Sequence, residues 1–112
     1  MQRCNLCEAW RHPPSPACPR CSGTSSRWDL VTGAARLFSY TVVHHAPSVQ
    51  LVGQVPYNIA VVEFAGMGDA RLISNVIDVS PAQLRIGMPL WLVWQNDMQG
   101  RPLPLFSARP TV

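Results

Sequence analysis

The sequence contains no lysine, since all nine of its basic side chains are arginines, against six acidic residues. Schiff-base and lysine general-base chemistry are therefore excluded, although a genome that favours arginine codons would also produce such a chain. Charged residues amount to only 13% of the 112 residues, and about 25% is usual for a soluble domain. So few charges leave apolar patches of the kind that normally mark an interface. We therefore expect an obligate partner.

Long hydrophobic runs are missing as well. No apolar run reaches the roughly 18 residues that a transmembrane helix needs, and the opening segment MQRCNLC lacks the apolar core of a signal peptide. The sequence therefore predicts a cytoplasmic protein that does not cross a membrane. Convincing helical periodicity, internal repeats and low-complexity tracts are also absent from the sequence, which points away from an α-helical fold.

The four cysteines form two C-x-x-C pairs, Cys4 with Cys7 and Cys18 with Cys21. Two residues between paired cysteines let the backbone turn both sulfurs toward one point, and four thiolates satisfy a tetrahedral zinc ion. A disulfide framework is disfavoured in a cytosolic chain, and a redox C-x-x-C motif needs no second pair. We predict a zinc ribbon over residues 1–28 that holds one structural Zn²⁺ with no open position for catalysis.

The segment between the two cysteine pairs, residues 8–17, carries three prolines, and we expect it to form an extended loop. His12 lies in this loop, but the fourth cysteine makes it unnecessary as a ligand. Four thiolates around one Zn²⁺ would also lower the formal net charge of +3 by two units. The apparent basicity of the chain then largely disappears.

After the ribbon come short runs rich in β-branched and aromatic residues, separated by Gly, Pro, Asn and Asp. These runs are 25–33, 35–45, 57–65, 70–79 and 89–96. Only residues 81–87 look helical. We predict an all-β chain in which the four-cysteine zinc ribbon is followed by a small five-stranded OB-fold barrel over residues 29–112, because an immunoglobulin sandwich usually needs about seven strands. Gly33 is expected to mark a sharp bend in the first barrel strand.

The order of several segments resembles a known family. The segments are CNLC, PPSPACPRC, FSYTVVHHAP, VPYNIAVVEF, ARLISNVI, RIGMPLWLVW and LPLFSARP. In this order they make nearly the whole chain similar to the acyl-CoA-associated OB-fold proteins with a rubredoxin-like zinc ribbon, first catalogued as domain of unknown function thirty-five. Members of that family commonly carry a helical stretch before the ribbon. Here Cys4 comes almost at once, so the contacts of such a stretch would be absent or supplied by another chain.

The resemblance implies a non-catalytic subunit that assembles with a thiolase-superfamily enzyme, or sits beside a hot-dog-fold enoyl-CoA hydratase. The partner would act on a CoA thioester, by carbon–carbon cleavage such as steroid side-chain retro-aldol or thiolysis, or by acyl transfer or condensation. The OB-fold subunit would stabilise the complex and help to enclose the acyl-CoA.

The sequence contains no convincing catalytic set of its own. Its cysteines are committed to zinc, and His12, His44 and His45 have no evident nucleophile as a partner. Candidates for contact with the partner or with CoA are His44, Pro56, Tyr57, Arg71, Arg85, Trp91 and Trp94. Each has a structural alternative: a strand-end role for His44, barrel packing for Tyr57, and plain solvation for the two arginines, whose guanidinium groups could otherwise pair with phosphates.

The tryptophans are the strongest candidates for an interface. Trp91 and Trp94 are three residues apart, so on one strand they face opposite sides of the sheet. We expect one of them in the core and the other exposed as a contact with the partner. Trp28 is expected to pack between the ribbon and the barrel, and Phe106 to close the barrel edge.

A second hypothesis is a single-stranded nucleic-acid-binding module, because zinc ribbons and OB barrels both serve that purpose. The low net charge and the scattered arginines predict little counterion release and weak binding to phosphates. The sequence therefore favours the accessory-subunit hypothesis.

Overall fold

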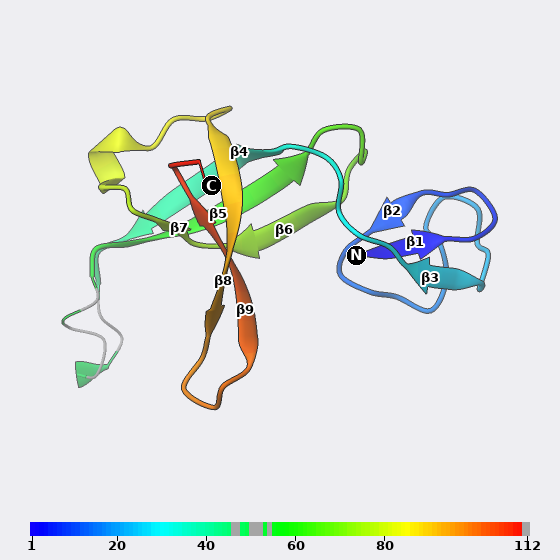
Figure 1. Cartoon of the computed structure of the whole chain (residues 1–112), viewed down its shortest axis with the longest axis horizontal. Coiled ribbons are helices and arrows are strands. Elements are labelled where there is room, and N and C mark those ends of the chain that lie inside the picture. The colour runs from blue at the N-terminus through cyan, green and yellow to red at the C-terminus, as the bar shows by residue number, and fades with distance from the viewer. Residues whose placement is uncertain (46–47, 50–52, 54, 111–112) are drawn as a thin grey trace.

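The computed structural model describes residues 1–45, 48–49, 53 and 55–110. Regular structure in these ranges is mostly β-strand, divided between a small sheet at one end of the long axis and a larger barrel at the other (Figure 1). The described ranges contain no helix long and apolar enough to cross a membrane.

The small sheet contains three antiparallel strands in the order β2-β1-β3. They are β1 (Gln2–Cys4), β2 (Trp10–Arg11) and β3 (Ser26–Trp28). Two expectations are corrected here. The segment 8–17 is not loop throughout, because β2 pairs with β1 before the first proline. The run 25–33 is not a barrel strand, because its only paired residues, 26–28, complete this small sheet.

The interior of the small sheet is polar. Along β1, Gln2 and Cys4 are buried while Arg3 between them is half-buried. Because side chains alternate along a strand and Gln2 lies opposite Arg11 in the register, Gln2, Cys4 and Arg11 share one face. The buried side chains among residues 1–28 are Cys4, Cys18, Gln2 and Arg11.

The barrel sheet has the strand order β6-β5-β4-β8-β9-β7. Its strands are β4 (Ala35–Val43), β5 (Tyr57–Phe64), β6 (Arg71–Ser74), β7 (Val76–Ile77), β8 (Pro89–Asn96) and β9 (Pro102–Ser107). All pairs are antiparallel except β7 with β9. The all-β ribbon-plus-OB-barrel architecture is thus confirmed. The strand count differs, since β7 is an additional short strand and β9 replaces the run 25–33.

Side chains complete the barrel where the strands do not pair fully. The side chain of Asn58 donates to the Val76 carbonyl at 2.9 Å and accepts from the Val76 N–H at 2.7 Å, as a neighbouring strand would. Ser74 Oγ donates to the Pro104 carbonyl at 2.6 Å. These bonds join β5 to β7 and β6 to β9, which satisfies buried backbone groups.

The barrel core is apolar and is set by strict alternation. Every second residue of β5 is buried, and the core cluster includes Leu37, Val62, Leu90 and Phe106. Phe106 was expected at the barrel edge, but it is 1% exposed and its ring centroid lies 6.1 Å from that of Phe64. The edge assignment is wrong because β9 pairs on both sides, with β8 and β7.

Gly33 lies between the small sheet and the barrel, outside any strand. It therefore does not bend a barrel strand. A Cβ at this position would collide with the carbonyl oxygen of Ala65, whose N–H donates to the Ala34 carbonyl at 3.0 Å. Glycine is required here by the close approach of two backbone segments.

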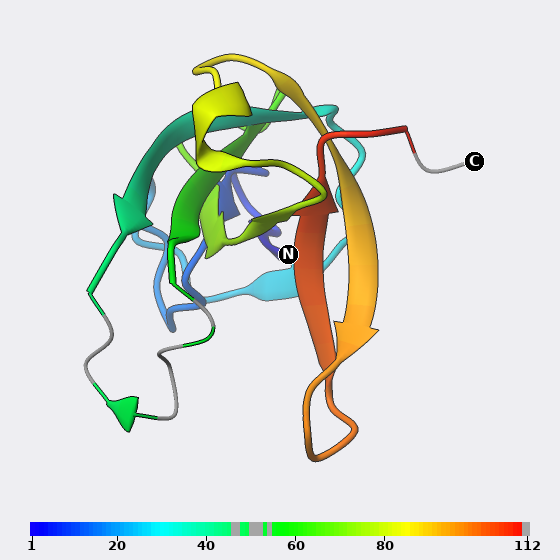
Figure 2. The same cartoon turned by 90° about the vertical axis from the view of Figure 1, so that its left-hand side faces the viewer.

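The short 3-10 helix η2 (Pro81–Gln83) forms in the region predicted to be helical. After it, β8 and β9 form a hairpin that extends well beyond the rest of the barrel, as Figure 1 and Figure 2 show. At its tip Asp97 accepts hydrogen bonds from the N–H groups of Gln99 and Arg101, each at 2.8 Å. The Arg101 side chain adds an ion pair at 2.8 Å.

Candidate metal centre and interaction surface

Two tight loops carry the cysteines, and both have the same backbone pattern. In each, the N–H four residues after the first cysteine donates to that cysteine's carbonyl: Glu8 to Cys4 at 3.0 Å and Ser22 to Cys18 at 2.8 Å. Glu8 and Ser22 both adopt a left-handed conformation, with φ of 64° and 63°. Such values are uncommon for residues other than glycine. The repeated geometry presents the two cysteine pairs to a common centre.

The four sulfur atoms lie within 4.8 Å of one another. The Sγ atoms of Cys4 and Cys21 are 3.6 Å apart, as are those of Cys7 and Cys18. A tetrahedral ion with bonds of about 2.3 Å to sulfur places its ligands about 3.8 Å apart. The donor set therefore fits a tetrahedral metal ion and fills its coordination sphere.

Backbone N–H groups point at these sulfurs. The N–H groups of Cys7 and Leu6 lie 3.5 and 3.3 Å from Cys4 Sγ and lower the pKa of the Cys4 thiol to about 6. The N–H groups of Cys21 and Arg20 lower the pKa of Cys18 in the same way. Donors aimed at sulfur favour the thiolate, which is the form that binds metal.

Cys21 shows the opposite tendency without a cation. The Gly23 N–H lowers its pKa, but hydrogen bonding with the Cys4 and Cys7 thiols and burial together raise it to about 11. The cluster therefore resists full ionisation by itself, because thiolates held so closely repel one another. A bound metal cation would remove that obstacle.

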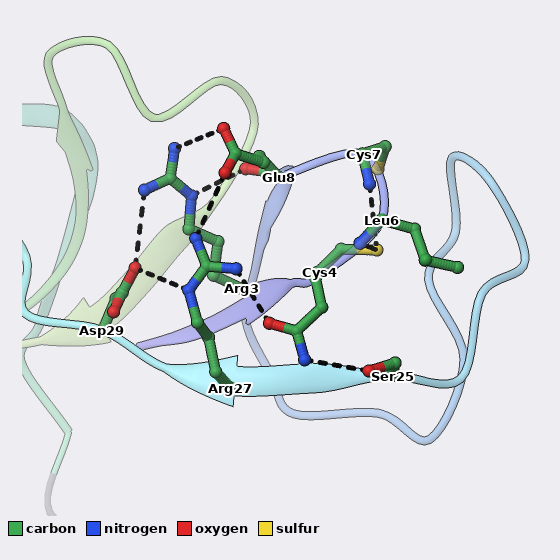
Figure 3. A network of polar contacts seen from close by, with 9 residues as sticks. Arg3, Cys4, Leu6, Cys7, Glu8, Ser25, Arg27 and Asp29 are labelled. Carbon is green, nitrogen blue, oxygen red and sulfur yellow. Dashed lines mark hydrogen bonds and ion pairs between the residues drawn. The ribbon is translucent and has the colours of Figure 1, made fainter.

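The opposite face of the small sheet carries a network of charged residues (Figure 3). Arg3 and Arg27 are opposite each other in the register of β1 and β3, and both contact Glu8 and Asp29. The Arg3 guanidinium also lies 4.6 Å from the centroid of the Trp10 ring. The network joins the first cysteine loop to the segment that leads into the barrel.

Comparison with known proteins identifies both parts of the chain. Residues 1–26 match the rubredoxin-like zinc ribbon domain of ChsH2, and residues 28–95 match its C-terminal OB-fold domain. The chain belongs to the ChsH2 family. The resemblance seen in the sequence is thereby confirmed.

Two curated proteins are similar to this chain in sequence. A probable enoyl-CoA hydratase alpha subunit of Thermomonospora curvata is 39% identical over all of this chain and 33% of the relative's length. A DUF35 domain-containing scaffold protein of Methanocaldococcus jannaschii is 30% identical over 84% of this chain and 65% of the relative. The chain therefore spans less than two thirds of either relative.

A solved structure described as Ltp2-ChsH2(DUF35) aldolase is also similar. The match has a TM-score of 0.80 and 36% sequence identity, and covers 95% of this chain and 80% of the matched chain.

Two of the predicted contact residues lie together. Pro56 and Tyr57, at the start of β5, line a cavity of about 540 Å³ with Asn58, Asn75 and Val76. Its volume lies in the range of small-molecule sites, about 300–1,000 Å³. His44 is exposed directly after the last residue of β4.

The two predicted arginines make local contacts instead of meeting at one site. The Arg71 guanidinium stacks 3.8 Å from the centroid of the Phe38 ring, which is 41% exposed on the outer face of β4. Arg85 donates to the carbonyl groups of Ala82 and Leu84 at 2.8 and 2.9 Å. Arg85 is exposed, in line with its solvated alternative, whereas Arg71 is half-buried and stacked and is not simply solvated. Contact of either arginine with a partner or with CoA stays a prediction.

Trp91 and Trp94 face opposite sides of β8, but neither lies in the core, where one of them was expected. Trp94 is 61% exposed although it shares a strand face with buried Leu90. Trp91 is half-buried and does not belong to the core cluster. The reason is the length of the hairpin, because the inward face of β8 runs past the end of the barrel and loses its cover.

This uncovered face contributes to an apolar groove of about 380 Å³. Leu92 and Trp94 of β8, Trp28 and Leu30 around the end of β3, and Phe106 of the barrel core line it. The lining residues are mostly apolar and come from both the ribbon and the barrel. Such a groove is the kind of surface that protein partners cover.

Two residues of this groove correct the sequence expectations. Trp28 does not pack between ribbon and barrel but is 68% exposed, and Met1 and Trp10 pack against the barrel core instead. Leu30, 86% exposed, was missed because its run was taken for a strand. The available sequence signal was the Trp28-x-Leu30 pair shortly before Gly33, a residue type that weakens a strand.

Proposed function

We propose that this chain is a non-catalytic subunit of an enzyme complex that acts on CoA thioesters, and that its partner is a thiolase-superfamily enzyme. The observation that carries the proposal is the match to the Ltp2-ChsH2(DUF35) aldolase over 95% of the chain. The relative named as a probable enoyl-CoA hydratase alpha subunit points to the same thioester chemistry. We favour carbon–carbon cleavage of the retro-aldol type as the partner's reaction.

The candidate chemistry of the described residues agrees with a supporting role. Four cysteines converge on one point and fill a tetrahedral site, which leaves no position for substrate or water. The histidines His12, His44 and His45 are exposed. In the part of the chain that the structure describes, no nucleophile is hydrogen-bonded to a histidine.

We further propose that the bound ion is Zn²⁺, one per chain, held by Cys4, Cys7, Cys18 and Cys21. A tetrahedral set of four sulfurs suits zinc. The ion would serve as a structural link between the two cysteine loops. Metal analysis of the purified protein, with one zinc per chain as the expected result, tests this assignment.

The apolar groove is the proposed contact with the partner enzyme. Trp94 and Trp28 both line it and are largely exposed, and buried tryptophans dominate the energetics of many interfaces. The cavity beside Pro56 and Tyr57 is the candidate position for part of the acyl-CoA. In this arrangement the subunit shapes and covers a site whose reacting groups belong to the partner.

The experiment is co-purification of the chain with the thiolase-like protein from its own host, followed by a CoA-thioester cleavage assay on the complex. Trp94→Ala should raise the dissociation constant of the complex at least tenfold, about 1.4 kcal/mol. Ile73→Ala is the matched control, because Ile73 is 70% exposed on β6 and does not line the groove. Equal binding by both variants would move the interface elsewhere, and absence of any partner would refute the accessory role.

Nucleic acid binding receives little support from the structure. Five of the nine arginines, Arg3, Arg27, Arg36, Arg71 and Arg101, are engaged in ion pairs with acidic residues. Paired arginines have less charge to offer to phosphates, so the counterion release that drives nucleic acid binding is small.

A further inference from the structure

The interior of the ribbon contains a cation without a carboxylate partner. Arg11 is 4% exposed. Its Nε donates to the Gln2 side-chain oxygen at 2.9 Å and its Nη2 to the Ser15 carbonyl at 3.0 Å. Both acceptors are neutral. Nη1 is shielded from solvent and has no hydrogen-bond partner in the structure.

Such an arrangement needs an explanation. A guanidinium stays protonated in proteins, and a buried charge that lacks a counter-charge is strongly destabilising. Within the described residues, none of the ion pairs between basic and acidic side chains includes Arg11. No direct ion pair within these residues therefore compensates its charge.

The register of the small sheet places Arg11 on the same face as Cys4. Arg11 on β2 is opposite Gln2 on β1, so it shares the buried face of the sheet with Gln2 and Cys4. The other arginines of this sheet, Arg3 and Arg27, share the opposite face, where Glu8 and Asp29 neutralise them. Among the arginines on the strands of this sheet, Arg11 is thus the one that shares a face with Cys4.

We infer that Arg11 is the internal counter-cation of the metal centre. Four thiolates around a divalent ion carry a net charge of −2, and Arg11 balances part of it through the interior of the ribbon, where solvent screening is weak. The inference rests on the proposed metal site. Because no hydrogen bond joins Arg11 to a sulfur, its effect is one of charge at a distance, and Arg11 acts as a positioning residue and not as a ligand.

If this inference is right, zinc affinity depends on the charge at position 11 and not on the shape of the side chain. Arg11→Gln should raise the zinc dissociation constant at least tenfold, measured by competition with a chromophoric chelator. Arg11→Lys keeps the charge and should stay within threefold of the unaltered protein. Arg27→Gln is the control, because it removes an equal charge from the opposite face and should leave zinc affinity within threefold.

A second measurement separates charge from packing. With iron in place of zinc, the centre carries one more negative charge in the ferrous than in the ferric form, so a nearby cation favours the ferrous form. Arg11→Gln should therefore lower the reduction potential, by about 59 mV for a tenfold change in the ferrous-to-ferric ratio. Arg11→Lys should restore it. Arg11→Met, which leaves no orphaned donor, serves the same purpose if the Gln variant does not fold.

The outcomes test the role of Arg11 separately from the existence of the metal site. Loss of affinity in Arg11→Gln with recovery in Arg11→Lys, together with the lower potential, supports the inference. Equal losses in the Gln and Lys variants with an unchanged potential would assign Arg11 to packing and overturn it. An unaltered protein that takes up no metal would instead refute the metal site itself.

Discussion

The ribbon and the barrel are built on opposite kinds of interior. Among residues 1–28 the buried side chains are two cysteines, a glutamine and an arginine. The barrel buries a continuous cluster of aliphatic and aromatic side chains around Leu37, Val62 and Phe106. Burial of apolar area is the main force that stabilises a fold, and the ribbon has almost none of it. One short chain thus draws on two sources of stability, a metal centre and a hydrophobic core.

Metal removal should have the largest effect, because it should destabilise the ribbon without unfolding the barrel. Binding of zinc to four cysteines contributes about 10–16 kcal/mol in small zinc domains, so chelation, or Cys4→Ser, should unfold residues 1–28. The barrel should remain folded because the buried residues of its core all lie between Ala35 and Phe106, and from the ribbon only Met1 and Trp10 are among the side chains packed against them. Backbone amide spectra recorded before and after chelation measure both halves in one sample. Simultaneous collapse of the barrel signals would show that the two interiors are coupled.

A cavity in the barrel should destabilise the barrel and leave the metal centre unchanged. Phe106→Ala removes a side chain that is 1% exposed in the centre of the core and should lower the free energy of unfolding by about 3–5 kcal/mol. Zinc affinity should stay unchanged. Urea denaturation followed by circular dichroism gives the first quantity and chelator competition the second. Phe38→Ala is the control, since Phe38 is 41% exposed and should lose far less.

The smallest effect concerns acid and the hairpin tip. The Arg101 N–H, reinforced by the Arg101 side chain and the Gln99 N–H, holds the pKa of Asp97 below its ordinary value of 3.8. A lowered carboxyl pKa in the folded state contributes stability above the unfolded value, and this contribution is lost as the pH falls through the folded pKa. The stability difference between the unaltered protein and Asp97→Asn should therefore be present at pH 6 and vanish at strongly acidic pH. A difference that does not change with pH would contradict this role.

Acid should also destabilise the ribbon more than the barrel, since thiolates must be deprotonated to bind metal. The ribbon is therefore expected to open at a pH where the barrel is still folded.

The sequence was most informative where a local pattern carries its own geometry. Two C-x-x-C pairs bring four sulfurs together because the short spacing restricts the backbone, and the structure gathers the same four cysteines. The run of β-branched and aromatic residues over 57–65 predicted a strand, and the structure has β5 there with every second residue buried. Such patterns need no knowledge of distant contacts.

Long-range pairing decided the rest. The run 25–33 has the composition of a barrel strand, yet its paired residues join β1 in the ribbon. Pairing partners are set by the whole fold, and a single run does not contain that information. The same limit explains Phe106, whose central position follows from β9 pairing with both β8 and β7.

The sequence by itself determined the four-cysteine cluster, the all-β class and the family, because cysteine spacing and runs of β-branched and aromatic residues are local properties of the chain. The tertiary structure alone decided which apolar side chains stay uncovered and which charge is buried. Trp94 is exposed because the β8–β9 hairpin outruns the barrel, and Arg11 is buried because β2 lays it on the cysteine face of the ribbon. Both depend on how separate strands meet. Trp94 lies in the groove proposed to bind the partner, and Arg11 lies in the interior of the ribbon that is proposed to hold the metal.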